Sequence, residues 1–287
     1  MNYRHIFHAG NFADVFKHLL LARALEYFQQ KNKPYFVLDT HGGIGYYDLQ
    51  GDQAIRTAEA EQGIVRFAEH SAEEPLAAAY LSTVRQLNEE QDKLRYYPGS
   101  PVITSEFLRE NDRLVVCELH KEDAETLKNT PLGRHKQVQI LAPMDGYQAV
   151  RAQLPPAEKR GLVLIDPPFE NTTEFDDVVS ALEQGLKRWK SGSFAVWYPI
   201  KDELKTAAFH RDVGALSDLP KTLIMELNIR TNDERKGLHG CGFLWVNPPY
   251  GVVQDSEHLL PVLCKTLAQD KGANFHSRWL VGEQLLT

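Results

Sequence analysis

Two short segments of the chain end in almost the same tetrapeptide. "LVLIDPPF" (Leu162–Phe169) ends in Asp-Pro-Pro-Phe, and "FLWVNPPY" (Phe243–Tyr250) ends in Asn-Pro-Pro-Tyr. Such a tetrapeptide can act on an exocyclic aromatic amine, which is a weak nucleophile because its lone pair is delocalised into the ring. In the first copy, the Asp166 carboxylate and the Pro167 carbonyl would accept the two amine N–H bonds. The consecutive prolines would fix the direction of that carbonyl.

The ring of Phe169 completes this chemistry. It would offer a stacking face to a base that has been taken out of its helix. A methyl group could then be transferred in line, by proximity and orientation, without a covalent enzyme intermediate. Asp166, Pro167 and Phe169 are therefore the expected catalytic residues. No nucleophilic cysteine is needed, and we expect Cys117 to belong to the core.

A glycine-rich turn predicts the site of the methyl donor. In "FVLDTHGGIG", Asp39 ends an apolar run and is followed by Gly43 and Gly45. This spacing lets the backbone approach a nucleoside cofactor at the carboxyl edge of a sheet. A purely structural turn is the simpler alternative.

Later strand ends favour the cofactor reading. Glu118 follows the second strand, where an acidic residue commonly holds a ribose diol. Asp145–Gly146 follows the third, where the adenine of S-adenosylmethionine is usually met. Either acid could instead be a helix cap. Ser100, predicted as an N-cap before Pro101, would present free N–H groups and its hydroxyl to a carboxylate of the cofactor.

The elements that must position these residues alternate short apolar runs with helical segments, which predicts an α/β fold with a mostly parallel sheet. The last two runs are joined by a connection too short for a helical crossover, so they should form an antiparallel hairpin. Five parallel strands followed by a hairpin is the Rossmann-like class I methyltransferase sheet. The expected strands are Tyr35–Asp39, Arg113–Glu118, Gln137–Leu141, Gly161–Asp166, Ser193–Tyr198, Thr222–Ile229 and Cys241–Val246.

Strand direction decides between the two tetrapeptides. Asp166 ends the fourth parallel strand and should lie at the same edge as the cofactor. Asn247 follows an antiparallel strand and should lie at the opposite edge. We therefore expect Asp166–Phe169 to be the working copy and Asn247–Tyr250 to be a proline-rich strand exit.

The connection between the first two strands is much longer than a simple βαβ unit needs. Its excess, residues 49–96, is rich in Ala, Glu, Gln and Leu, which predicts a helical subdomain inserted into the methyltransferase domain of residues 1–287. We expect it to clamp the substrate or to serve packing.

The first helix is dense in polar groups. An apolar stripe is expected on one face and Asp14, Lys17 and His18 on another, which a solvated face would also explain. A metal site is an alternative without a recognised ligand spacing, and we expect no metal. The stripe consists of Phe12, Val15, Phe16 and Leu19, and the candidate ligands are His5, His8, His18 and His41.

Composition sets the outer limits. A net charge of −7 argues against a protein covered by nucleic acid, though not against one basic face. Three cysteines without a CxxC motif, no membrane-length apolar run and no signal-peptide layout at the start favour the cytoplasm. Nothing implies an oligomer, and we expect a monomer with no membrane partner.

Several motifs together resemble the RlmJ family. Those enzymes use S-adenosylmethionine to methylate the N6 of an adenine in 23S rRNA (position 2030 in the usual rRNA numbering). The resemblance covers essentially the whole chain and supports the inserted helices. The motifs, in order, are "YRHIFHAGNFADVFKH", "LDTHGGIG", "RYYPGSP", "ELH", "MDG" and "LIDPPF".

The resemblance also implies roles for individual residues. Asp166 would be the catalytic acid, and Tyr3 would contact the substrate. The family tetrapeptide usually ends in Tyr, so Phe169 keeps a stacking face and lacks a hydroxyl. The implied cofactor contacts are His18, His41, Ser100, Glu118, Asp145–Gly146 and Asp166.

Contact with RNA is expected from local patches on an acidic body, although each patch could be ordinary solvated surface. Trp197–Lys201, at the end of the fifth strand, should help to shape the base pocket. The expected RNA-contacting residues are Tyr3, Arg4, Lys17 and, in the hairpin turn, Arg230, Arg235, Lys236 and His239.

Alternatives to an rRNA enzyme remain. A DNA adenine-N6 or cytosine-N4 methyltransferase would want a target-recognition domain and a more basic cleft. A glutamine methyltransferase of translation factors would require Asn247–Tyr250 to be the working copy. A non-catalytic RNA-binding assembly protein would not need Asp166 or the glycine turn.

Overall fold

The computed structural model describes residues 5–51, 54, 57–233 and 237–282. Four of the expected RNA-contacting residues, Tyr3, Arg4, Arg235 and Lys236, lie outside this range. The other expected site residues lie within it.

The parallel half of the central sheet matches the sequence prediction. β1 (Phe36–Asp39) lies in the middle, paired in parallel with β4 (Arg113–Cys117) on one side and β6 (Gly161–Ile165) on the other. β5 (Val138–Leu141) and β7 (Ser193–Ile200) extend this parallel half. All residues of β1 and β6 are buried because helices cover both faces of the sheet.

The other half of the sheet is antiparallel. β9 (Gly240–Val246) lies between β7 and β8 (Thr222–Asn228) and is antiparallel to both. β8 therefore runs in the direction of the parallel strands, and the connection after it starts at their carboxyl edge, as predicted. The strand order β10-β8-β9-β7-β6-β1-β4-β5 confirms the Rossmann-like methyltransferase sheet.

One strand of this sheet was not predicted. β10 (Asn274–Val281) pairs antiparallel with β8 and forms the sheet edge. Most of its residues are exposed, so the segment lacks the buried alternation by which a strand is recognised in a sequence.

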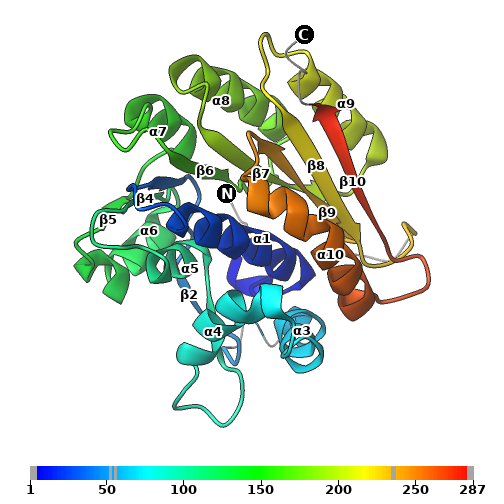
Figure 1. Cartoon of the computed structure of the whole chain (residues 1–287). Helices are drawn as coiled ribbons and strands as arrows, with labels where there is room; N and C mark the ends of the chain where they lie inside the picture. Colours follow the sequence, from blue (N-terminus) through cyan, green and yellow to red (C-terminus); the bar gives the residue numbers. More distant parts are fainter. Residues whose placement is uncertain (1–4, 52–53, 55–56, 234–236, 283–287) are drawn as a thin grey trace.

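Helices form a layer on each face of the sheet (Figure 1). One apolar core includes residues of α1 (Phe12–Gln29), α5 (Ser100–Glu106) and α10 (Tyr250–Leu267). The other includes α7 (Gly146–Gln153), α8 (Glu174–Arg188) and α9 (Glu203–Gly214). α6 (Lys121–Lys128) contributes Leu127 to the first core.

The first helix is covered nearly all round. The stripe of Phe12, Val15, Phe16 and Leu19 is buried, and so are Asp14, Lys17 and His18 on the polar face. A solvated face is therefore the wrong explanation for these charges. α1 contacts α5, α10 and the segment between β1 and β4, which together enclose it.

The long connection between β1 and β4 begins and ends in a small antiparallel pair. β2 (Tyr46–Asp48) pairs with β3 (Tyr96–Pro98). Between them lie short helices, drawn in cyan below α1 in Figure 1. They are η2 (Glu61–Val65), α3 (Arg66–His70), η3 (Pro75–Ala77) and α4 (Ala78–Gln86).

Candidate active site

A cavity of about 620 Å³ opens at the carboxyl edge of the parallel strands. Its volume is in the range of small-molecule and cofactor sites. Asp166 and Lys17 line it together with residues from α1, the glycine turn, α5 and the connection after β8. Of the expected site residues, the cavity brings together Lys17, His18, His41, Gly43, Ser100, Glu118, Asp166, Pro167, Trp197, Lys201 and Arg230.

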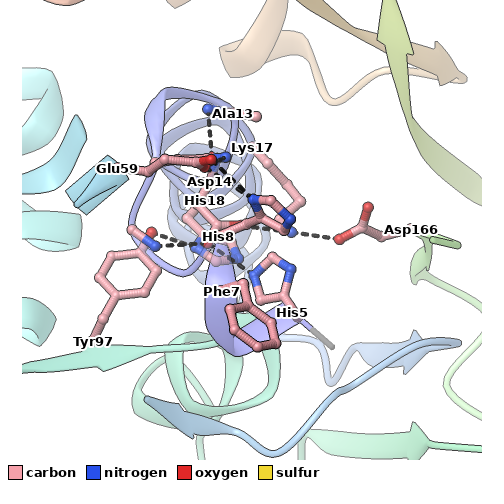
Figure 2. Close-up of polar contacts among 12 residues, drawn as sticks. His5, Phe7, His8, Ala13, Asp14, Lys17, His18, Glu59, Tyr97 and Asp166 are labelled. Carbon is pink, nitrogen blue, oxygen red and sulfur yellow. Dashed lines mark hydrogen bonds and ion pairs between the residues drawn. The ribbon is translucent and has the colours of Figure 1, made fainter. Parts of the chain in front are cut away.

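Asp166 directly follows β6, and its carboxylate meets an ion pair from the first helix. The Lys17 ammonium donates to Asp166 Oδ2, and Lys17 Nζ lies 3.0 Å from Asp14 Oδ1. Asp14 Oδ2 accepts a hydrogen bond from Gly10 N and contacts His5 Nε2, both at 2.9 Å. Figure 2 shows His5, Asp14 and Lys17 near one another, with a dashed line that leads from this group to Asp166.

Burial and charge fix the ionisation of this group. Burial lowers the pKa of Lys17, but the carboxylates of Asp14 and Asp166 outweigh this effect and raise the pKa above its usual value. Burial raises the pKa of Asp14, but the charges of His5 and Lys17 outweigh it and hold the pKa well below its usual value. Lys17 is therefore an ammonium group at neutral pH and cannot accept a proton.

The glycine turn after β1 has the geometry that the sequence predicts. Gly43 and Gly45 have φ angles of 59° and 78°, in the left-handed region that favours glycine. Gly43 N donates to Glu118 Oε2 at 2.9 Å, which joins the turn to the end of β4. Glu118 also accepts from His120 N, and burial raises its pKa. Gly45 itself does not line the cavity.

Asp39 lies behind the cavity wall. Burial raises the pKa of Asp39 to about 6, although a hydrogen bond from Ser100 opposes the shift. Its Oδ2 is buried and has no hydrogen-bond partner in the described part of the chain. Ser100 is the first residue of α5 and Gly99 occupies the N-cap, so the prediction of Ser100 as the cap was wrong.

Two histidines, His18 and His41, line the cavity on the side of the glycine turn. Both are neutral. Burial lowers the pKa of His41 to about 4 and that of His18 well below its usual value. His18 Nδ1 lies 2.6 Å from Tyr97 Oη, while His18 Nε2 is buried without a described partner. Buried polar atoms without partners beside a cavity are atoms that a polar ligand could satisfy.

Asp145 and Gly146 do not line the cavity. Asp145 is the N-cap of α7 and accepts a hydrogen bond from Tyr147 N at 2.8 Å. The helix-cap alternative therefore describes what this carboxylate does here. A Cβ on Gly146 would come within 2.2 Å of Thr40 O, so glycine is required where α7 packs against the end of β1.

Phe169 lies in an aromatic cluster beside the cavity. Its ring centroid is 4.8 Å from that of Phe175 and 6.0 Å from that of Trp197. Trp197 and the two prolines of the tetrapeptide line the cavity, whereas Phe169 does not. Its φ of 49° is strained for a bulky residue, and such strain is often found at functional sites.

The other half of the cavity is formed by residues beyond Asp166. Pro199 and Lys201 come from the end of β7, and Arg230 and Leu238 come from the connection after β8. Arg230 is buried and donates to Asp233 Oδ1 at 3.0 Å and to Gly237 O at 3.1 Å. Its guanidinium therefore braces the connection. His239 is also buried.

Several residues that line the cavity were not predicted from the sequence as parts of the active site. His5, Asn11, Asp14 and Glu59 line the cavity. Asn11 caps α1, accepting from Ala13 N and Asp14 N. An Asn before an apolar helix is a recognisable start signal, and it would have placed Asp14 in the first turn. Glu59 had no such signal.

Asn247 lies at the opposite edge of the sheet, as predicted. Its Nδ2 donates to the carbonyls of Lys190 and Gly192, both at 2.9 Å, next to the start of β7. Ser193 Oγ donates to Asn247 O at 2.8 Å. The second tetrapeptide is therefore a structural strand exit, and α10 begins at its Tyr250.

The described residues offer neither a metal centre nor a membrane-spanning helix. No group of three or more His, Cys, Asp or Glu side chains within the described ranges could hold a metal ion. In the same ranges, none of the helices combines the length and the apolar character that crossing a bilayer requires. Cys117 is buried in the core, and burial raises its thiol pKa.

Comparisons with known proteins agree with this geometry. The sequence model of the RsmJ family, described as ribosomal RNA large subunit methyltransferase D, RlmJ, matches residues 32–281. The ribosomal RNA large subunit methyltransferases J of Haemophilus influenzae and Escherichia coli are 38% and 36% identical, over 99% of this chain and 100% of each relative.

A solved structure supports the same assignment. The crystal structure of protein LPL1258 from Legionella pneumophila superimposes with a TM-score of 0.86 at 34% identity, covering 94% of this chain and 97% of that one. The sequence similarity and the structural similarity both extend over nearly the full length of the chain. The chain belongs to the RlmJ family of ribosomal RNA large subunit methyltransferases.

Proposed function

We propose that the protein transfers a methyl group from S-adenosylmethionine to the exocyclic N6 of one adenine in 23S rRNA. The observation that carries this proposal is the position of Asp166 at the cavity. It lies between the half formed by the glycine turn and Glu118 and the half formed by Lys201 and Arg230. We take ribosomal RNA as the substrate class from the names of the relatives.

The residues of the first half fit the cofactor. His41, Gly43, Ser100 and Glu118 would hold it, and the unpartnered atoms Asp39 Oδ2 and His18 Nε2 are available to its polar groups or to water. S-adenosylmethionine supplies, when bound, an electrophilic methyl group on a sulfonium. Asp145–Gly146 would act on it only indirectly, by fixing the start of α7 against β1.

The residues around Asp166 would prepare the amine. Lys17 engages one carboxylate oxygen, and the other remains an acceptor for an amine N–H. The Pro167 carbonyl would accept the second N–H. These two acceptors would favour a pyramidal nitrogen whose lone pair points at the methyl group. Since Lys17 is already protonated, the proton released after transfer passes to Asp166 or to solvent.

The second half of the cavity would receive the base. An adenine inside an RNA helix cannot reach Asp166, so it would have to be turned out of the stack. Trp197 lines this half of the cavity, and the ring of Phe169 packs against the ring of Trp197. Stacking of the base on Phe169 remains a prediction, as do contacts of RNA with Tyr3, Arg4, Lys17, Arg235 and Lys236.

Mass mapping of 23S rRNA from a strain lacking this gene tests the proposal. We expect one N6-methyladenine to become unmodified, and to return with the wild-type gene but not with Asp166→Ala. A missing modification elsewhere would redirect the substrate. Methyl transfer to DNA but not to rRNA would favour a DNA enzyme. Full methylation in the absence of the gene would favour a non-catalytic assembly protein.

A further inference from the structure

The segment between β1 and β4 reaches the start of the chain close to the ion pair of Asp166. Thr57 Oγ1 donates to Phe7 O at 2.5 Å. Glu59 contacts His8 Nδ1 through both carboxylate oxygens, each at 3.1 Å. Asn11 Nδ2 donates to Glu59 Oε2 at 3.0 Å. Figure 2 shows Glu59 beside the group that ends at Asp166.

Asn11 connects Glu59 to the first turn of α1. Its side-chain oxygen accepts from Ala13 N and Asp14 N, at 2.9 and 3.0 Å, while its amide nitrogen is held by Glu59. The cap therefore has its rotamer fixed from both sides. Asp14, within this first turn, holds Lys17, and Lys17 contacts Asp166. A short chain of polar contacts thus runs from Glu59 to the catalytic carboxylate.

The backbone around Glu59 is arranged at some cost to make these contacts. Ala58 has a φ of 51°, in the left-handed region that alanine seldom adopts. Ile64 N donates to Gly10 O at 2.8 Å, and a Cβ on Gly63 would lie 2.1 Å from Gly10 O. The two segments therefore approach more closely than any side chain at position 63 would allow.

We propose that Glu59 is a positioning residue for the methyl-transfer step, holding His8 and Asn11 so that Asp14 and Lys17 keep Asp166 aligned. It does not touch the reacting atoms. Through Glu59, the segment between β1 and β4 would contribute to catalysis by holding Asp166 in place. The inference rests on the proposed function, because Asp166 must be the group that receives the amine.

Charge complementarity supports the same arrangement. The hydrogen bond that His8 donates to Glu59 raises the pKa of His8 despite burial. Burial raises the pKa of Glu59, but the hydrogen bonds from His8 and Asn11 outweigh it and lower the pKa. A negative Glu59 beside a cationic His8 would hold more firmly than two neutral groups.

Single-turnover methyl transfer to 23S rRNA tests the proposal. We expect Glu59→Ala to slow the transfer step about tenfold, with the Kd for S-adenosylmethionine unchanged, because small misplacements of reacting groups cost that much or more. Glu59→Gln keeps an acceptor for Asn11 and should recover most of the rate. Glu61→Ala, at an exposed position two residues away, is the matched control and should be silent.

Chemical labelling gives a readout that does not depend on activity. Lys17 is buried, so an amine-acylating reagent should modify it slowly in the wild type. In Glu59→Ala it should react several-fold faster, while exposed Lys201 serves as the internal reference. If the wild type does not methylate rRNA, the proposed function fails, and the labelling still tests the contact chain.

Three outcomes would overturn the proposal. The first is a wild-type transfer rate in Glu59→Ala. The second is a raised KM for RNA at an unchanged rate, which would make Glu59 an RNA contact. The third is unchanged labelling of Lys17 in Glu59→Ala.

Discussion

The tetrapeptides Asp166–Phe169 and Asn247–Tyr250 differ little in letters and completely in surroundings. Asp166 ends a parallel strand, lines the cavity and meets the Lys17 ammonium. Asn247 ends an antiparallel strand at the other edge, and its amide binds two backbone carbonyls. The direction of the strand, and not the motif itself, decides which copy can do chemistry.

The largest effect on methyl transfer is expected from a change in the first tetrapeptide, at Asp166. Asp166→Ala removes an acceptor at the reacting amine, and methyl transfer should fall by at least about a hundredfold. Binding of S-adenosylmethionine, followed by calorimetry, should remain measurable. An active Asp166→Ala enzyme would contradict our choice of tetrapeptide.

Lys17→Met tests whether the Asp166 carboxylate can support methyl transfer without its ion pair to Lys17. The change leaves Asp14 buried beside one cation fewer, so the free energy of unfolding should fall by about 3–5 kcal/mol. The transfer rate should fall as well, because Asp166 loses its partner. Urea denaturation and single-turnover assays separate the two effects, and Lys17→Arg, which keeps the charge, should be milder on both. A fully active Lys17→Met protein would show that the pair is not needed.

At the sheet edge that carries the cavity, the affinity for S-adenosylmethionine should depend on pH through Asp39. The pKa of Asp39 is raised to about 6, so this carboxyl is mostly neutral at pH 5 and ionised at pH 7. If the cationic amino group of S-adenosylmethionine binds near this wall of the cavity, it would favour the ionised form. The affinity for S-adenosylmethionine should then rise with pH up to about 6, by up to about tenfold per unit, and level off above it. Asp39→Asn should flatten this profile, and an equal slope in that variant would exclude Asp39 as the cause.

Asn247→Ala should change stability and leave the chemistry alone. Two carbonyls lose their donor, and alanine tolerates the φ of 50° less well than asparagine. We expect the free energy of unfolding to fall by about 1–3 kcal/mol. The transfer rate, measured below the melting transition, should stay within about twofold of the wild type. A loss of activity like that of Asp166→Ala would reverse the assignment of the two copies.

Phe169→Tyr should have the smallest effect. The ring already lies in an aromatic cluster with Phe175 and Trp197, and the added hydroxyl changes its stacking face little. We expect a change of less than about threefold in the transfer rate on rRNA. A larger gain would mean that a tyrosine hydroxyl at this position makes a contact that this protein lacks.

Most of the sheet could be predicted because its central strands are buried on both faces and end in characteristic turns. β10 could not, because its exposed edge position leaves no apolar pattern. Residues at the ends of predicted strands, such as Glu118, were correctly expected to meet at one edge of the sheet, where the cavity lies. Glu59 was missed because its contacts with His8 and Asn11 join segments that are distant in sequence, and no local pattern encodes them. Asp14 was placed beside Lys17 on the first helix, but its link to the site depends on the contact between Lys17 and Asp166, which are also distant in sequence.

The pairing of β2 with β3 has a consequence for how this sheet can evolve. The two ends of the segment that they enclose are hydrogen-bonded to each other. The distance to be spanned between β1 and β4 therefore does not depend on the length of the segment. Changing the length of such a closed excursion costs only about 0.6 kcal/mol per doubling in chain entropy. The exposed turns of the segment can therefore change in length while the sheet folds as before, provided that its side chains packed in the core with α1, and the stretch around Glu59, keep their contacts.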